Sequence, residues 1–113
     1  MKVVTAIIKP FKLNDVRDAL NALGIAGLTV TQVQGFGRQR GHGLVYRGPE
    51  YEAKFIPKLK IEVFVPSDLA PKVFETMMTS AHTGQMGDGK VYIMEIEQVA
   101  RIRTGERDRE ALL

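Results

Sequence analysis

Residues 58–65, KLKIEVFV, alternate strictly between two sets of side chains, and this pattern restricts the possible folds more than any other segment. The apolar set is Leu59, Ile61, Val63 and Val65, and the opposing set is Lys58, Lys60, Glu62 and Phe64. Because successive side chains of a strand point to opposite faces, a period of two predicts a β-strand with one face on an apolar core. The chain is therefore expected to build a sheet that is covered on at least one side.

Two elements are predicted ahead of this strand. Residues 2–9 are β-branched and apolar and end at Pro10, which indicates a first strand that is buried on both faces. Residues 13–23 carry apolar side chains at three- and four-residue spacing, which predicts a helix with one apolar stripe. Asn14 or Asp15 is the expected N-cap of that helix, because short polar side chains accept hydrogen bonds from the free N–H groups of a first turn.

Three more elements follow the same reasoning. Residues 28–36 begin with Leu28 and Val30 on one face and Thr29 and Thr31 on the other, as expected of a half-buried strand. Residues 69–81 carry a helical apolar stripe, and Ser67 or Asp68 is the expected N-cap. Residues 91–99 are rich in β-branched and apolar side chains, which predicts the last strand.

The order strand, helix, strand, strand, helix, strand predicts one α+β domain over residues 1–113. It is the split βαβ pattern of ferredoxin-like domains (βαββαβ), with an antiparallel sheet and both helices on one face. Such an open sheet leaves its second face and its edges unprotected in so small a protein. Association with copies of the same chain would cover them, so we expect an oligomer.

Composition narrows the class of function. An apolar content of 44% with 26% charged residues is ordinary for a globular protein. The chain has no cysteine, which removes disulfides, thiolate metal sites and thiol catalysis together. The first ten residues do not read as a signal peptide, so a cytoplasmic location is expected. A net charge of +3 favours anionic ligands without saying which kind.

The connection between the second and third strands, residues 37–55, is far longer than a hairpin requires. It holds several glycines and prolines and also Tyr46, Arg47 and Tyr51, side chains that often anchor protein interfaces. A loop built for partner contact explains both features, although an insertion without function would have the same length.

A second candidate segment, residues 82–90, contains TGQMGDGK. Gly84 to Lys90 satisfies the spacing of a phosphate-binding P-loop, but Val91 replaces the Ser or Thr that would bind Mg²⁺. The segment also leads from a helix to a strand, the reverse of a P-loop, so that interpretation fails. Glycine-rich backbone can still direct N–H groups at an anion, with Lys90 adding charge, or it can form a plain turn.

Arg101 and Arg103 are expected on one face of an extended segment, where two guanidinium groups would suit a polyphosphate. The alternative is a pair of surface arginines bound to Glu106 or Asp108. His42 and His82 have no partner at the spacing of a known catalytic or metal motif, so we predict no enzyme.

Five ordered motifs closely resemble the PII signal-transduction proteins: AIIKPFKLNDVRDAL, TVTQVQGFGRQRGH, YRGPEY, TGQMGDGK and RIRTGE. The resemblance spans nearly the whole chain. It implies a ferredoxin-like homotrimer with nucleotide sites between subunits. It also implies a signalling loop at 37–55, a phosphate-binding loop at 82–90 and a C-terminal loop and tail at 101–113.

The same resemblance implies the ligands and the residues that bind them. ATP or ADP would contact Thr29, Gly37, Arg38, Gln39, Phe64, Gly87, Asp88, Gly89, Lys90, Arg101, Ile102 and Arg103. With Mg²⁺ and ATP bound, 2-oxoglutarate would contact Gln39, Lys58 and Gly87, and Gln39 would also be a ligand of the metal. Hard oxygen ligands suit Mg²⁺.

Partners are implied as well. They include ammonium transporters, nucleotidylyltransferases and nitrogen-assimilation enzymes or kinases, with the membrane approached only through a transporter. Tyr46, Arg47 and Tyr51 would make partner contacts, and Tyr51 matches a residue that some relatives modify. The function implied is the sensing of nitrogen, carbon and energy status.

Two other functions were weighed. RNA-recognition domains share the βαββαβ order, but KLKIEVFV lacks their third-strand glycines and paired aromatics, so no nucleic-acid partner is expected. Slow ATP hydrolysis would be conceivable at a metal-bound triphosphate, yet the sequence offers no identifiable general base.

Overall fold

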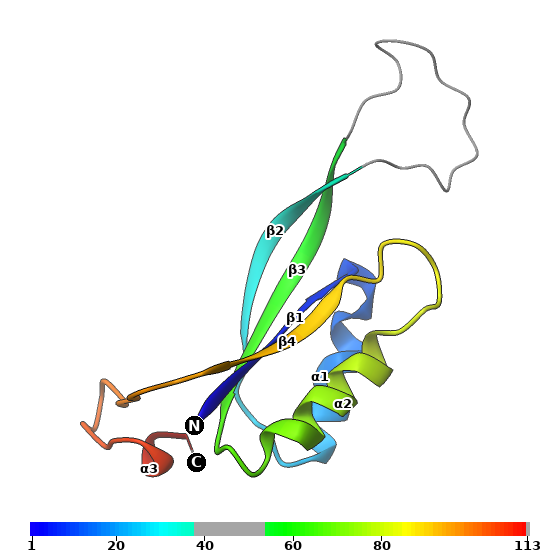
Figure 1. The fold of residues 1–113 in the computed structure, drawn as a ribbon. Helices are drawn as coiled ribbons and strands as arrows, with labels where there is room; N and C mark the ends of the chain where they lie inside the picture. The colour runs from blue at the N-terminus through cyan, green and yellow to red at the C-terminus, as the bar shows by residue number, and fades with distance from the viewer. Residues whose placement is uncertain (38–53, 113) are drawn as a thin grey trace, which may run out of the picture.

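A four-stranded antiparallel sheet forms the centre of the computed structural model, which describes residues 1–37 and 54–112. Its strands are β1 (Lys2–Ile8), β2 (Thr29–Gly37), β3 (Lys54–Val65) and β4 (Lys90–Glu95). They lie side by side in the order β2-β3-β1-β4 (Figure 1). With one long helix after β1 and one after β3, this is the predicted ferredoxin-like α+β fold, and the fold class is confirmed.

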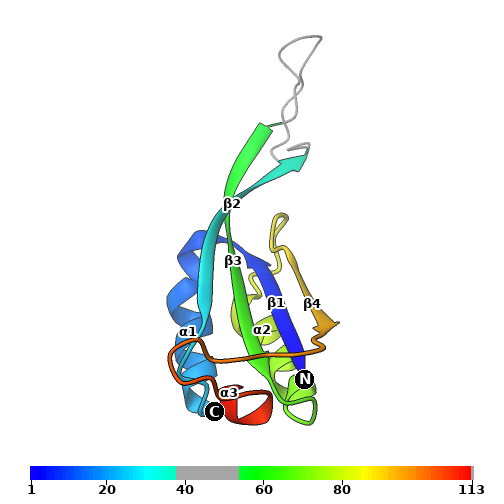
Figure 2. The ribbon, with the colours of Figure 1, turned by 90° about the vertical axis from the view of Figure 1, so that its left-hand side faces the viewer.

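Both long helices cover the same face of the sheet (Figures 1 and 2). They are α1 (Leu13–Ala22), which follows the short 3-10 helix η1 (Pro10–Lys12), and α2 (Ala70–Ala81). Within the described residues 1–37 and 54–112, no helix combines the length and apolar character needed to cross a membrane.

The core lies between the two helices and the covered face of the sheet. On β3, Ile61, Val63 and Val65 are buried, so the alternation seen in the sequence is confirmed. The matching residues of β1 and of the helical stripes complete the cluster: Val4, Ala6, Ile8, Val16, Leu20, Val73 and Met77. Full burial of each large apolar side chain contributes about 1.5–3 kcal/mol. The predicted core is therefore the one that forms.

The opposite face, which we call the open face, also has a buried centre. Val3 and Thr5 of β1 are 5% and 1% exposed, because larger side chains on both neighbouring strands enclose them. Val3 lies opposite Phe64 on β3 and Met94 on β4. Phe64 and Met94 themselves stay 42% and 56% exposed. The first strand is thus buried on both faces, as predicted, and the rim of the open face presents apolar side chains to the surroundings.

Strands β2 and β3 continue past the rest of the sheet as a two-stranded ribbon (Figure 1). Their pairing runs from Thr29 opposite Glu62 to Gly37 opposite Lys54. The sequence placed the start of β3 four residues too late, at residue 58, because the strict alternation begins there. Since the pairing of β1 with β3 stops at Leu59, β3 has a single partner strand at Pro57, and a proline is tolerated there.

The predicted helix caps are wrong. The N-cap positions are Lys12 for α1 and Leu69 for α2. The preceding turn, η1 in the case of α1, leads directly into the helix, so the chain needs no polar cap at the predicted residue. Ser67 instead accepts a hydrogen bond of 2.8 Å from the N-terminal ammonium of Met1.

The C-terminal segment crosses the lower end of the open face (Figure 2). Strand β4 ends at Glu95, four residues before the predicted end, and the Ile96 N–H then donates to the Met1 carbonyl at 2.9 Å. The segment turns back so that Ala100 forms a single β-bridge with Arg107, and it closes with α3 (Arg109–Leu112).

Candidate functional site

Two lysines and a glycine-rich segment meet where the ribbon leaves the sheet. Lys9 directly follows β1, Lys58 lies on β3, and residues 82–89 connect α2 to β4. The Lys58 ammonium donates a hydrogen bond to the Gly87 carbonyl. A Cβ added at Gly87 would lie 3.2 Å from Lys58 Nζ and 3.5 Å from Lys9 Cε, and the φ of Gly87 is +93°. The fold therefore brings two cations against one exposed stretch of backbone.

Asp88 organises this segment through both of its carboxylate oxygens. Oδ2 accepts hydrogen bonds of 2.8 Å from the backbone N–H groups of Thr83 and Gly84. Oδ1 accepts from the Thr83 hydroxyl and lies 3.2 Å from Lys9 Nζ. Lys9 Nζ also donates to Thr83 Oγ1 at 3.0 Å. We call Lys9, Thr83 and Asp88 the Lys9 clasp, because these contacts close the 83–88 segment into a loop and tie it to β1.

The electrostatics follow from these contacts. The hydrogen bonds from Thr83, reinforced by Gly84 and Lys9, hold the pKa of Asp88 well below its ordinary value, so its carboxylate is charged at neutral pH. Partial burial lowers the pKa of Lys58, the nearby charge of Lys9 lowers it further, and Asp88 acts in the opposite direction. One carboxylate therefore faces two ammonium groups, which leaves a local excess of positive charge.

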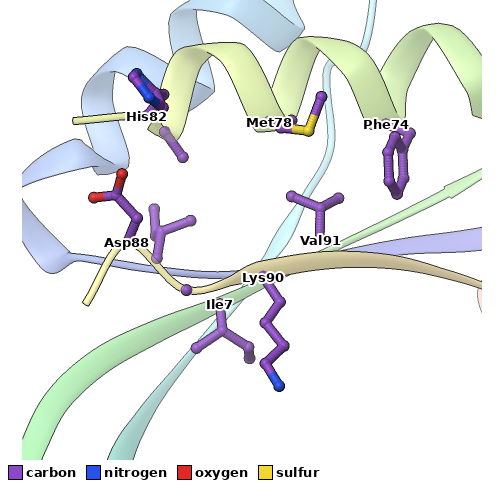
Figure 3. A pocket seen from close by; sticks show the side chains of 10 residues that line it. Ile7, Phe74, Met78, His82, Asp88, Lys90 and Val91 are labelled. Carbon is purple, nitrogen blue, oxygen red and sulfur yellow. The ribbon is translucent and has the colours of Figure 1, made fainter. Parts of the chain in front are cut away.

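At Gly89 any side chain would collide with β1. Its φ is +90°, and a Cβ built there would lie 1.7 Å from the Ile7 carbonyl oxygen of β1. This contact brings the segment directly onto the sheet where β4 begins. In Figure 3 the Asp88 carboxylate lies on the side of α2, near His82, whereas the Lys90 side chain points to the other side of the strand. Lys90 is thus directed toward the open face.

A hollow of about 420 Å³ lies beside these cations, at the root of the ribbon. It is lined by Lys9, Lys58 and Gly87 and by apolar side chains that include Phe11 and Phe36, while the Lys9 ammonium itself contacts Thr83 and Asp88. Cationic groups in a partly apolar hollow suit a small anion that carries carboxylates, since ammonium groups form charge-assisted hydrogen bonds with them.

The other predicted contacts lie at the opposite end of the sheet. Thr29 begins β2, and Phe64 lies near the end of β3. Phe64 and Lys58 are separated by six residues of the same strand, which corresponds to roughly 20 Å at about 3.3 Å per residue. Within one chain, Phe64 therefore does not reach the Lys58 end of the sheet.

The arginines are arranged differently from the prediction. Residues 101–105 form a turn, in which the Gly105 N–H donates to the Arg101 carbonyl at 2.7 Å, and the expected extended segment is wrong. The guanidinium of Arg101 forms an ion pair with Glu106 and donates to the Ala111 carbonyl at 3.4 Å. Ile102 is 99% exposed at the tip of this turn. The alternative interpretation, an arginine paired with Glu106, describes Arg101 in this structure.

The remaining predicted residues divide into two groups. Gly37 is the last residue of β2, opposite Lys54. Arg38, Gln39, Tyr46, Arg47 and Tyr51 lie outside the described residues. Of the predicted site residues, the structure brings together Lys58, Gly87, Asp88 and Gly89.

Sequence reasoning missed Lys9, Thr83 and the Ile7 carbonyl. All three lie within the quoted family motifs, but no role was assigned to them, because Lys9 and Thr83 are 74 residues apart and meet only after the sheet has formed. The one available signal was the position of Lys9 at the end of a buried strand, immediately before Pro10.

This chain is similar to known proteins over nearly its whole length. The sequence profile of the family described as "Nitrogen regulatory protein P-II" matches residues 1–106. The chain is 59% identical to "Nitrogen regulatory protein P-II" of Rhizobium etli, over 99% of this chain and 100% of the relative. It is 55% identical to "Nitrogen regulatory protein GlnK" of Escherichia coli strain K12, with the same coverage.

A solved structure is similar as well. The crystal structure described as Arabidopsis thaliana PII bound to citrate superposes with a TM-score of 0.81 at 37% sequence identity. The match covers 97% of this chain and 90% of the Arabidopsis chain.

Proposed function

This chain belongs to the P-II family of nitrogen regulatory proteins, and we propose that it senses ATP or ADP together with 2-oxoglutarate and reports them to partner proteins. Its relatives are named as regulatory proteins, and the chain is accordingly a non-catalytic regulator in nitrogen signalling. The identity of the ligands and the partners is the part that we propose.

The observation that carries the proposal is the cationic hollow at the root of the ribbon. A carboxylate placed there would meet the Lys58 ammonium, with the charge of Lys9 nearby. A related protein has been solved bound to citrate, a small polycarboxylate, which supports an acid of the size of 2-oxoglutarate. Because Gly35, Phe36 and Ile56 line the hollow and are close in sequence to residues 38–53, occupancy at this position is suited to act on that segment.

The nucleotide is proposed to bind between copies of the chain. The Gly87–Lys90 segment and the residues Thr29, Phe64 and Arg101 lie at opposite ends of the sheet, roughly 20 Å apart by strand length. One nucleotide contacts both sets only if the second set comes from a neighbouring copy. The apolar rim of the open face, with Phe64 and Met94, offers a surface for that association. We therefore propose the homotrimer implied by the sequence, with Arg103, Ile102 and Lys90 also near the nucleotide.

Mg²⁺ fits this site as an ion that is held mostly by oxygen atoms of the nucleotide and the acid and by few protein side chains. The described residues contain no group of three or more His, Cys, Asp or Glu side chains that could hold a metal. Both oxygens of Asp88 already accept hydrogen bonds within the loop. Mg²⁺ commonly binds through phosphates and only one or two protein oxygens, and Gln39 is the residue proposed to supply one. When bound, the ion would supply positive charge that offsets the charge of the phosphates and of the acid.

Partners are proposed from the family. They are an ammonium transporter, a nucleotidylyltransferase, or a nitrogen-assimilation enzyme or kinase, contacted through Tyr46, Arg47 and Tyr51. Modification of Tyr51 and the cytoplasmic location stay predictions from the sequence. Tyr51 lies among residues 38–53, which are outside the described part of the chain.

The test is calorimetric titration of 2-oxoglutarate into protein saturated with Mg²⁺ and either ATP or ADP. We expect binding with ATP and much weaker binding with ADP, because only ATP brings a γ-phosphate to the metal. Replacing Lys58→Ala removes a charge-assisted hydrogen bond and should weaken acid binding by about 10-fold or more. Lys12→Ala removes an ammonium that is paired with Asp15 and does not line the hollow, and it is the matched control. Equal acid affinity with ATP and ADP would refute the proposal.

A further inference from the structure

Lys9 has contacts that the proposed ligand roles do not explain. Its ammonium does not simply line the hollow, since it lies 3.0 Å from Thr83 Oγ1 and 3.2 Å from Asp88 Oδ1. The side chains of Lys9 and Asp88 are only 17% and 24% exposed, so water screens this pair less than an exposed ion pair. The contact joins the end of β1 to the loop that precedes β4.

The loop in turn depends on Asp88. With two backbone N–H groups and one hydroxyl donating to its carboxylate, Asp88 satisfies donors that would otherwise face solvent. The Gln85 N–H adds a 3.1 Å hydrogen bond to Thr83 Oγ1. Thr83 Oγ1 thus accepts from Lys9 and Gln85 while it donates to Asp88. These contacts form one small network that closes the segment, and Lys9 is its link to the end of β1.

That network places the backbone on which the binding site depends. Gly87 immediately precedes Asp88, and the Gly87 carbonyl accepts the hydrogen bond of Lys58. Gly89 immediately follows Asp88 and packs against the Ile7 carbonyl. A change in the position of Asp88 is therefore transmitted to the groups on both sides, because a peptide chain has only two soft dihedral angles per residue.

We propose that Lys9 is a positioning residue: it clamps Asp88 and Thr83 and so fixes the 83–89 segment against Lys58, which makes anion affinity depend on Lys9 without direct contact. This inference rests on the proposed function for the identity of the anion. The Lys9 clasp itself does not depend on the proposed function, because its contacts exist in the chain without ligand.

The first experiment measures the clasp in ligand-free protein. Amide hydrogen exchange at Thr83 and Gly84, the two N–H groups held by Asp88, should be at least about 10-fold faster in Lys9→Met than in the wild type. Lys9→Arg, which keeps the charge and the donors, should restore slow exchange. The control is Lys12→Met, since Lys12 has the same 17% side-chain exposure and also forms an ion pair, with Asp15 at 2.9 Å. Unchanged exchange in Lys9→Met overturns the proposal.

The second experiment measures affinity for 2-oxoglutarate in the presence of Mg²⁺ and ATP. Lys9→Met should weaken binding by about 10-fold, and Lys12→Met should leave it unchanged. In the Asp88→Asn background the clasp is already broken, so adding Lys9→Met should change affinity less than about 2-fold. A full additional loss in that background would show that Lys9 contacts the ligand directly, and it would overturn the positioning role.

The two experiments separate the possible failures. If the wild type binds no 2-oxoglutarate with Mg²⁺ and ATP, the proposed function fails, while the exchange experiment still decides whether Lys9 holds the loop. If the wild type binds and Lys9→Met binds equally well, the proposed function stands and the role of Lys9 is refuted. Thermal melts of each variant at one protein concentration confirm that the fold is intact.

Discussion

Replacing Gly89→Ala tests the closest approach between the glycine-rich segment and the sheet. The added Cβ would lie 1.7 Å from the Ile7 carbonyl oxygen and 2.8 Å from the Ile7 carbonyl carbon, whereas ordinary contacts begin at 3.4 Å. Both obstructing atoms belong to the backbone of β1, which is paired on both sides. Neither can rotate away as a side chain would, so the segment must leave the sheet or the strand must move.

Two effects contribute to the loss of unfolding free energy expected for Gly89→Ala. An alanine at the φ of +90° found at Gly89 is strained by about 1–2 kcal/mol relative to glycine. Forcing extra volume into a packed position adds about 1–3 kcal/mol. We therefore expect Gly89→Ala to lower the free energy of unfolding by roughly 2–5 kcal/mol.

Alanine variants of two other glycines separate the steric collision at Gly89 from the backbone strain at positive φ. Gly24 has nearly the same φ, +87°, but nothing lies within 4 Å of an added Cβ, so Gly24→Ala should show the strain alone. At Gly27 the space is also open and φ lies outside the left-handed range, so Gly27→Ala should change stability by less than about 1 kcal/mol.

The assay is urea unfolding of the three variants at one protein concentration, followed by circular dichroism. The expected order of destabilisation is Gly89→Ala, then Gly24→Ala, then Gly27→Ala. If Gly89→Ala and Gly24→Ala lose the same stability within about 0.5 kcal/mol, the close approach to Ile7 is not a constraint and the reasoning is refuted.

Three further predictions concern the core, pH and the C-terminal turn. Leu20→Ala empties a fully buried position of α1 and should reduce unfolding free energy by about 2–5 kcal/mol; a urea midpoint within error of wild type would contradict this packing. Because the pKa of Asp88 is depressed in the folded state, Asp88 stabilises the fold above its unfolded pKa, and that contribution is lost as pH falls. Asp88→Asn should therefore flatten the dependence of unfolding free energy on pH between about pH 5 and pH 2, and an unchanged slope would count against the clasp. Glu106→Gln removes the charge paired with Arg101, so stability should change by less than about 1 kcal/mol while calorimetric ATP affinity increases; equal ATP affinity would mean that Glu106 does not compete for Arg101.

The sequence alone was sufficient for the order of the four strands and the two long helices and for the covered face, but it did not predict η1 or α3. Period two in residues 58–65 and the apolar stripes of the two helices are local patterns, and burial of one face follows directly from them. The family resemblance also pointed to Lys58, Gly87 and Gly89, which the structure brings to the root of the ribbon.

Local pattern failed at Pro57, where a distant strand decides the outcome, and in the arginine segment, where a hydrogen bond and an ion pair within a few residues decide it. Pro57 lies inside β3 because β2 pairs with it on one side and β1 does not reach it on the other. The arginine segment turns back because its own carbonyl at Arg101 accepts from Gly105 and its guanidinium binds Glu106. Neither result follows from propensity, because propensity describes the preference of a residue type and not its particular hydrogen bonds or strand partners.

The site itself belongs mostly to the tertiary structure. Residue types and spacing pointed to an anion at the glycine-rich segment, but Lys9 meets Thr83 across 74 residues of chain. The separation of Lys58 from Phe64 likewise depends on how β3 is laid across the sheet. Side-chain periodicity is set by the backbone of each segment, whereas contacts of this kind are set by the register of strands that pair only once the chain has folded.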